Sequence, residues 1–175
     1  SKIYRFLPAC ALFFALNLSA VIQFTADSAP VTVAPGITLT AVGDLIMHMP
    51  VVNSVYTAAD QNYDFRPIFA PLEADLKTAD FTVGVLETSL TAKYDQLSGY
   101  PRFNTPYQLA EALRWAGFDL VFTAHNHSLD QGVNGIISTL DHLEAVGLPA
   151  TGTRKNIHDK PYHIVAINGI KLAFL

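Results

Sequence analysis

The stretch Asp119–Gly132, which reads DLVFTAHNHSLDQG, decides how the chain folds, because an apolar run passes at once into polar side chains and then into a helical pattern. The run 119–122 is typical of a short buried strand. In open α/β sheets, ligands bind in the crevice beyond the carboxyl ends of the strands. Asn126 and His127 are therefore the first candidates for functional side chains.

Two further apolar runs end in the same way. The β-branched run 37–42 stops at Gly43 and Asp44, and the run 81–86 stops at Glu87. Glycine permits a tight turn that carries the carboxylate past the sheet. Carboxylate and amide oxygens joined by an imidazole suit a hard or borderline divalent metal, which makes a bound water acidic. Three strand ends thus deliver candidate metal ligands.

Each of these candidates also has a structural interpretation. Asp44 could be only a turn residue, and Glu87 could be a solvated carboxylate in a loop. Asn126 could cap the next helix, and His127 could be a structural histidine. Asp130 could fix the tautomer of His127 or cap that same helix. The residue types alone leave these alternatives open.

Other polar residues are weaker candidates. For Asn104 we favour a role in the turn before Pro106 over contact with a substrate. His125 could be an extra ligand or merely a neighbour of the site, and His48 is an equally weak candidate. Surface and packing roles are expected for the other histidines: His142, His158 and His163.

Helical patterns alternate with the strands. The spacing predicts helices over 67–77, over 107–115 with Thr105 as cap and Pro106 at the first position, and over 133–146 with Gly147 as the stop. The dipeptide Asn168-Gly169 predicts a hairpin, so that the chain ends inside a strand. This alternation favours an α/β layered fold.

Short motifs lie in order from about Ile37 to the last residue: AVGD at 41–44, LET at 86–88, GYPRFNTP at 99–106, AGFD at 116–119, HNHSLDQG at 125–132, TLD at 139–141 and TGT at 151–153. Several motifs in order are far more specific than any one alone. Together they resemble the CapA family of capsule and poly-γ-glutamate biosynthesis proteins, whose domain is related to calcineurin-like metallophosphoesterases.

The resemblance implies a metallophosphoesterase-like sandwich of mixed β-sheets flanked by helices. It implies that Asp44 binds one divalent metal ion, that Glu87 bridges two, and that Asn126 is a ligand. It also implies that His127 donates a proton. We add Asp130 to the expected catalytic residues because it lies three residues after His127 and could fix its tautomer. The expected cofactor is one or two divalent metal ions.

The chain departs from the pattern in two places. Ile46 stands where the phosphoesterase pattern has a histidine, and His125 stands where the family usually has asparagine. Family members also continue beyond the position of Leu175 and supply further histidines and an acidic residue. We therefore expect an N-terminal fragment whose domain, 37–175, lacks its C-terminal part.

The first 36 residues form a separate region. Phe6 to Ala26 carries no charge and follows Lys2 and Arg5, which predicts a signal peptide or an uncleaved signal anchor over 1–29, with cleavage favoured, and a linker over 30–36. Cys10 is the single cysteine, so the exported part would form no disulfide. We expect an extracytoplasmic protein, secreted or anchored at the cell surface.

The net charge of −4 provides no long-range attraction for a polyanion and excludes nucleic acid as a partner. Arg154, Lys155 and Lys160 form the one basic cluster, which we interpret as a solvated loop. The expected partners are an anionic polymer or phosphoester substrate and other capsule-synthesis membrane proteins. The main hypothesis is a metal-dependent hydrolase, and the alternative is a non-catalytic component of polymer assembly or export.

Overall fold

The computed structural model describes residues 14–16 and 36–175, and its centre is one five-stranded sheet. The strand order is β1 (Phe14–Leu16), β2 (Leu39–Leu45), β5 (Phe81–Leu86), β8 (Leu120–Phe122) and β9 (Ala150–Thr151). β2, β5, β8 and β9 run parallel, whereas β1 is antiparallel to β2. The predicted signal segment and linker otherwise lie outside the described residues.

Helices connect the parallel strands. α1 (Met49–Ser54), α2 (Arg66–Phe69) and α3 (Glu73–Thr78) lie between β2 and β5, α4 (Gln108–Ala116) lies between β5 and β8, and α5 (Gly132–Ala145) lies between β8 and β9. Because parallel strands require such crossovers, the carboxyl ends of β2, β5 and β8 meet at one edge of the sheet.

Three small two-stranded sheets and one 3-10 turn complete the described part. β3 (Tyr56–Thr57) pairs with β4 (Asn62–Tyr63), β6 (Ser89–Thr91) pairs with β7 (Asn104–Pro106), and β10 (His163–Ile167) pairs with β11 (Ile170–Phe174). The 3-10 turn η1 spans Tyr94–Gln96. No helix among the described residues has the length and apolar character needed to cross a bilayer.

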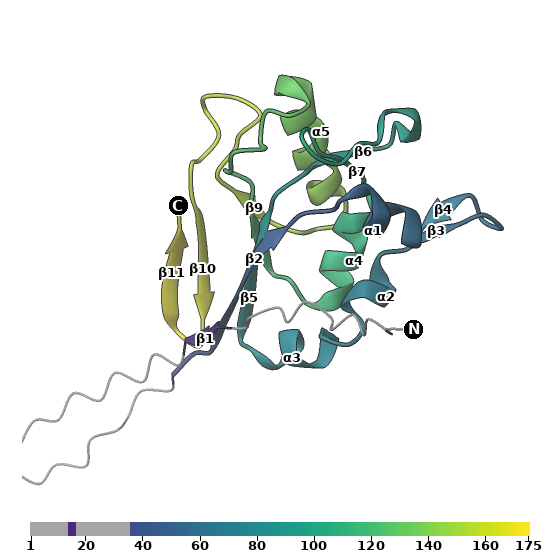
Figure 1. Cartoon of the computed structure of the whole chain (residues 1–175). Helices are drawn as coiled ribbons and strands as arrows, with labels where there is room; N and C mark the ends of the chain where they lie inside the picture. The colour runs from purple at the N-terminus through teal and green to yellow at the C-terminus, as the bar shows by residue number, and fades with distance from the viewer. Residues whose placement is uncertain (1–13, 17–35) are drawn as a thin grey trace, which may run out of the picture.

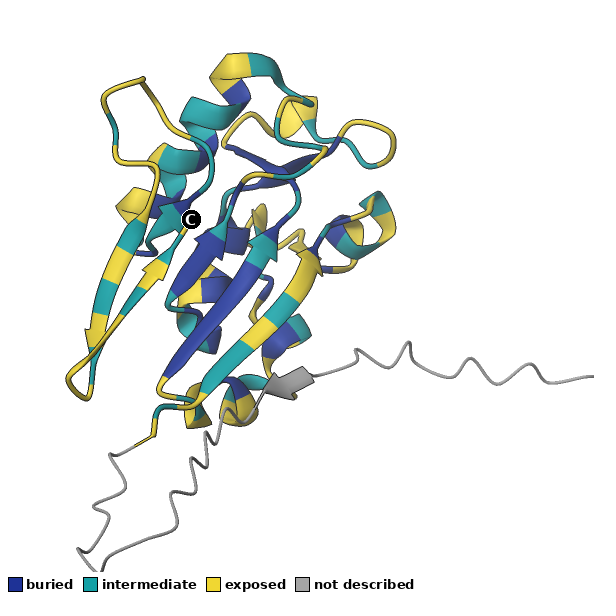
Figure 2. Cartoon of the chain, turned by 90° about the vertical axis from the view of Figure 1, so that its left-hand side faces the viewer, coloured by how far each residue is buried: buried dark blue, intermediate teal, exposed yellow. Residues whose placement is uncertain are grey.

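The central sheet is covered on both faces. One face packs against α2 and α4 through residues such as Leu86, Val121 and Phe118, and the other packs against the β10–β11 hairpin through Phe81 and Leu120. Figure 1 shows the helices and the hairpin on opposite sides of the sheet. Figure 2 shows that β5 and β8 are the buried strands of the sheet. The layered α/β fold with mixed sheets is confirmed.

Two local predictions are wrong. The helix expected over 67–77 is divided into α2 and α3, since Pro71 provides no N–H and its ring blocks the preceding turn. Thr105 and Pro106 lie in β7, so they do not begin α4. The Thr105 hydroxyl instead lies 2.8 Å from that of Thr88.

Two turn predictions are confirmed. Gly147 follows the last turn of α5 with φ 66°, a left-handed conformation that glycine adopts without strain. Asn168 and Gly169 join β10 to β11 with φ values of 48° and 80°, which are typical of a tight hairpin turn.

Candidate functional site

Asp44 lies at the end of β2 in an unusual backbone conformation. Its φ is 46°, which few residues other than glycine, asparagine and aspartate adopt. The pairing of β2 with β5 shifts register between Val42 and Leu45, so the residues between them leave the regular ladder. Asp44 is exposed as a result. The direction of its side chain no longer follows the regular up-and-down alternation of side chains along β2.

Glu87 follows directly after β5 and is the neighbour of Asp44. Its backbone N–H donates to the Leu45 carbonyl at 3.1 Å, which ties the ends of β2 and β5 together. Burial raises the pKa of the Glu87 carboxyl, and the hydrogen bond and charge of Asp44 raise it further, whereas His127 acts in the opposite direction. The two acidic side chains therefore share one small volume.

His127 comes from the loop after β8 and lies between two carboxylates. Its Nδ1 is 2.9 Å from Asp130 Oδ2, and its Nε2 is 4.0 Å from Glu87 Oε1. The side chain of His127 is 16% exposed, that of Glu87 14% and that of Asp130 11%. The imidazole is thus largely shielded from water, with its Nε2 facing the carboxylate pair.

Asp130 is held by the segment before β7. Its Oδ2 accepts the Phe103 backbone N–H at 2.6 Å, and its main-chain carbonyl accepts Arg102 Nε at 2.9 Å. The Phe103 ring meets the His127 ring edge-on, with 4.7 Å between centroids. The sequence analysis missed Arg102 and Phe103, although the GYPRFNTP motif that contains them was noted as a match.

The loop after β8 is stabilised by its own polar groups. Ser128 Oγ accepts the His125 N–H at 2.9 Å and bonds the carbonyls of Thr123 and His125. His125 Nδ1 accepts the His127 N–H at 3.1 Å. Burial lowers the pKa of His125, as does the positive charge that His127 can carry. Burial thus disfavours the charged form of His125, whose ring nitrogen contacts the His127 backbone.

The predicted residues divide into two groups. The structure brings Asp44, Glu87, His127 and Asp130 together at the carboxyl edge of the sheet. Asn126 is exposed, and its side chain makes no hydrogen bond within the described part of the chain. The residue that precedes α5 is Gln131, which makes no side-chain cap, so neither Asn126 nor Asp130 caps that helix.

Asn104 has a structural role in β7. Its side-chain amide donates to the Gln96 carbonyl at 2.9 Å, and its backbone pairs with Ser98. It is buried and fixes the loop that precedes Arg102 and Phe103. The expectation that Asn104 orders the chain before Pro106 rather than pointing to a ligand agrees with these contacts.

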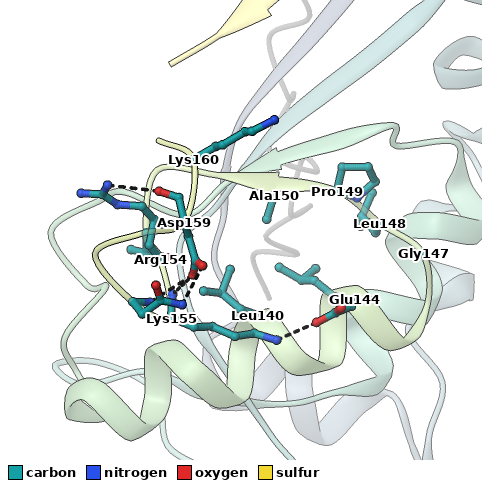
Figure 3. Close-up of a pocket in the computed structure, with 13 residues that line it drawn as sticks. Leu140, Glu144, Gly147, Leu148, Pro149, Ala150, Arg154, Lys155, Asp159 and Lys160 are labelled. Carbon is teal, nitrogen blue, oxygen red and sulfur yellow. Dashed lines mark hydrogen bonds and ion pairs between the residues drawn. The ribbon is translucent and has the colours of Figure 1, made fainter. Parts of the chain in front are cut away.

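The basic cluster lies away from this edge. Arg154, Lys155 and Lys160 border an open cavity of about 580 Å³ between α5 and β9 (Figure 3). Lys155 Nζ is 2.6 Å from both Asp141 and Glu144, so acidic side chains of α5 neutralise its charge. None of Asp44, Glu87 and His127 lines this cavity. The cluster therefore gives the edge of the sheet no basic patch.

Comparison with known proteins gives a consistent picture. A sequence model of the family described as "Bacterial capsule synthesis protein PGA_cap" matches residues 38–175. The chain is 26% identical over 144 residues to the capsule biosynthesis protein CapA of Bacillus anthracis, covering 79% of this chain and 34% of that protein. It is 26% identical over 112 residues to the PGA biosynthesis protein CapA of Bacillus subtilis, covering 62% and 30%.

An uncharacterized protein of Sinorhizobium fredii, y4sH, is 30% identical over 132 residues, covering 71% of this chain and 26% of that protein. The chain thus spans about a quarter to a third of the length of these relatives.

Proposed function

Since the chain belongs to the bacterial capsule synthesis protein family PGA_cap, we propose that it acts in capsule or poly-γ-glutamate biosynthesis through a metal-dependent, phosphoesterase-like hydrolase site. The observation that carries the proposal is the meeting of Asp44, Glu87, His127 and Asp130 at the edge where β2, β5 and β8 end. Strand ends at one sheet edge are the usual place for chemistry in such folds.

The donor chemistry at this edge fits a divalent metal ion. Burial and the neighbouring Asp44 carboxylate raise the pKa of Glu87. A bound cation would offset the repulsion between these two carboxylates. The number of donors is small, however. Among residues 36–175 no group of three or more His, Cys, Asp and Glu side chains is arranged to hold an ion. We therefore propose Asp44 and Glu87 as part of a ligand set.

Asn126 is proposed as a further ligand from the same loop as His127. Its exposed side chain has no competing hydrogen bond within the described residues and lies one position from the imidazole. A bound divalent metal ion would lower the pKa of a water molecule and offset negative charge on a substrate.

His127 and Asp130 have separate roles in this proposal. In this proposal the Nδ1–H of His127 donates a hydrogen bond to Asp130 Oδ2, which fixes the ring, and the protonated imidazolium donates its Nε2 proton to a leaving group. The Phe103 ring packs perpendicular to the imidazole, with 4.7 Å between the ring centroids. The substrate class is an anionic polymer or a phosphoester.

The first test is made in cells with His127→Ala in the chromosomal gene. We expect loss of the cell-associated anionic polymer at unchanged protein level. The matched control is His158→Ala, because His158 is exposed and only its backbone N–H makes a hydrogen bond within the described part of the chain. Normal polymer in His127→Ala cells would contradict the hydrolase.

The second test measures metal binding directly. The purified protein with Asp44→Asn should bind Mn²⁺ or Zn²⁺ at least about tenfold more weakly than the native protein, whereas Asp95→Asn, an exposed change, should not. Equal metal affinity in both variants would remove Asp44 from the proposed ligand set.

A non-catalytic role in polymer assembly or export is the second candidate. The absence of a group of three or more donors among residues 36–175 favours it. In that case polymer production continues in His127→Ala cells but fails when the protein is deleted. Other capsule-synthesis membrane proteins would be its partners, and crosslinking in cells would recover them.

We also propose an extracytoplasmic location, secreted or anchored at the cell surface. The apolar segment 6–26 behind Lys2 and Arg5 supports it. A fusion of the chain to alkaline phosphatase, which is active only after export, should give active reporter. An inactive reporter at normal fusion levels would contradict export.

A further inference from the structure

The segment 98–104, which leads into β7, places Arg102 against the loop that carries His127. Arg102 donates from both Nε and Nη2 to the main-chain carbonyl of Asp130, with 2.9 Å between Nε and the oxygen. A lysine ammonium does not present two donors in such a fixed fork. Because the partner is a carbonyl and not a carboxylate, this contact holds the main chain at Asp130 and neutralises no charge.

The segment is itself held before it reaches Asp130. The backbones of Ser98 and Asn104 pair at 3.1 and 2.9 Å, and the Ser98 hydroxyl donates to the Arg102 carbonyl at 2.6 Å. The Arg102 backbone N–H donates to the Gly99 carbonyl at 3.1 Å. The guanidinium of Arg102 therefore extends from a backbone that is already fixed.

Asp130 is held at its main chain and at its carboxylate. Its N–H donates to the His127 carbonyl at 3.1 Å, and its carbonyl accepts the Arg102 guanidinium. Its Oδ2 accepts the Phe103 N–H at 2.6 Å and lies 2.9 Å from His127 Nδ1. Two of these supports come from adjacent residues of segment 98–104. That segment thus determines where the carboxylate meets the imidazole.

The other contacts between the segment and the loop give less direction. Gln131 Nε2 donates to the Phe103 carbonyl at 3.3 Å, which is longer than most bonds of this kind. The Phe103 ring is buried and packs edge-on against the ring of His127, a contact without a hydrogen bond. Arg102 is exposed, so apolar burial does not explain its position. Its loss would leave the Asp130 carbonyl without this donor and free the following peptide plane to rotate.

We infer that Arg102 is a positioning residue of the proposed hydrolase, because through Asp130 it sets the tautomer and the direction of the His127 imidazole. The inference rests on the proposed function of His127. Without Arg102, the Asp130 carboxylate can turn away from Nδ1, and the proton of the neutral ring is then free to occupy either nitrogen. The ring would no longer hold Nδ1–H toward Asp130 with Nε2 facing Glu87.

The first test determines the tautomer of His127 in the purified protein with EDTA present, so that it depends on neither activity nor metal. Long-range proton–nitrogen NMR spectra at about pH 8.5, well above the ordinary pKa of histidine, show which ring nitrogen carries the proton. The His127 signals are those that disappear in His127→Ala. We expect the Nδ1–H form in the native protein, a mixed or Nε2–H form in Arg102→Ala, and an intermediate result in Arg102→Lys.

Arg154→Ala is the matched control. Arg154 is also exposed and also donates to a main-chain carbonyl, that of Asp159 at 3.3 Å. A role of Arg102 in folding alone would lower the free energy of unfolding and leave the His127 spectrum of the folded protein unchanged. An unchanged spectrum in Arg102→Ala, or the same change in Arg154→Ala, would therefore overturn the inference. If Arg102→Ala does not fold, a native His127 spectrum in Arg102→Lys would overturn it.

The second test measures the anionic polymer of cells at unchanged protein level. Arg102→Ala should lower it about tenfold, whereas Arg154→Ala should not. Normal polymer in Arg102→Ala cells together with its loss in His127→Ala cells would overturn the inference and leave the proposed function standing. Normal polymer in both variants would contradict the proposed function, and the inference with it.

Discussion

Asp130 Oδ2 lies 2.9 Å from His127 Nδ1 and accepts the Phe103 backbone N–H at 2.6 Å. One carboxylate oxygen thus connects the loop after β8 with the segment before β7. The contact fixes the orientation of the imidazole and directs Nε2 toward Glu87. The chemistry proposed for this edge depends on that orientation.

Asp130→Asn should lower polymer production strongly while leaving the protein level in the cell nearly unchanged. The amide oxygen can still accept the Phe103 N–H, but the amide no longer stabilises a charged imidazole. Loss of a group that orients a ligand or catalytic histidine typically costs about 10- to 100-fold. Polymer per cell, normalised to protein level, measures the effect. Asp95→Asn is the control, and equal output from both variants would contradict the orienting role.

Glu87→Gln should stabilise the metal-free protein at neutral pH. The pKa of Glu87 is raised in the folded state, so the folded carboxyl is stable in its protonated form and this contribution is lost as the pH rises through the folded pKa. The amide imitates the protonated form. We expect a gain of about 0.5–2 kcal/mol in urea denaturation with EDTA present. A loss of stability at pH 7 would refute this account of the carboxylate pair.

Stability should fall as the pH drops below 6.5, partly because of His142. Burial lowers the pKa of this histidine from 6.5, and its ring stacks on Tyr107 with 4.8 Å between centroids. A lowered folded pKa contributes stability above the unfolded pKa, and that contribution is lost as the pH falls through the folded pKa. Denaturation midpoints of His142→Gln between pH 7 and 5 should change less than those of the native protein. Parallel curves would show that His142 makes no contribution.

Gly84→Ala should destabilise the protein by about 1–3 kcal/mol. An added Cβ would lie 2.7 Å from Phe118 Cε1 and 2.8 Å from Leu45 Cδ1, both in the core between the sheet and the helices. The measurement is the free energy of unfolding in urea. Gly36→Ala is the matched control, since nothing lies within 4 Å of its added Cβ. Similar free energies for both variants would mean that Phe118 and Leu45 move aside at little cost.

The strand ends could be predicted from sequence because the evidence for them is local. Buried parallel strands are continuous apolar runs, and the polar residue that follows each run lies at a known edge of the sheet. Asp44, Glu87 and His127 were therefore predicted to lie close together, as the structure shows. Their roles in metal binding and catalysis stay predictions.

The remaining features depend on contacts that no local pattern contains. Whether Asp130 orients His127 or caps a helix was open until its contact with Phe103, 27 residues earlier, was known. The apolar spacing over 67–77 predicted one helix, but Pro71 interrupts it, and spacing alone does not show which of these two effects is stronger. The exposure of Asn126 likewise follows from the conformation of the whole loop.

The left-handed backbone at Asp44 separates two demands on β2. Residues 39–42 are constrained by the packing of the sheet. The direction of the Asp44 carboxylate is set instead by the turn where the pairing of β2 with β5 is irregular. One β-branched residue in this part of the strand can therefore be replaced by another without changing the direction of the Asp44 carboxylate. Position 44 itself accepts few replacements, because asparagine and glycine are the other residues at ease in that backbone.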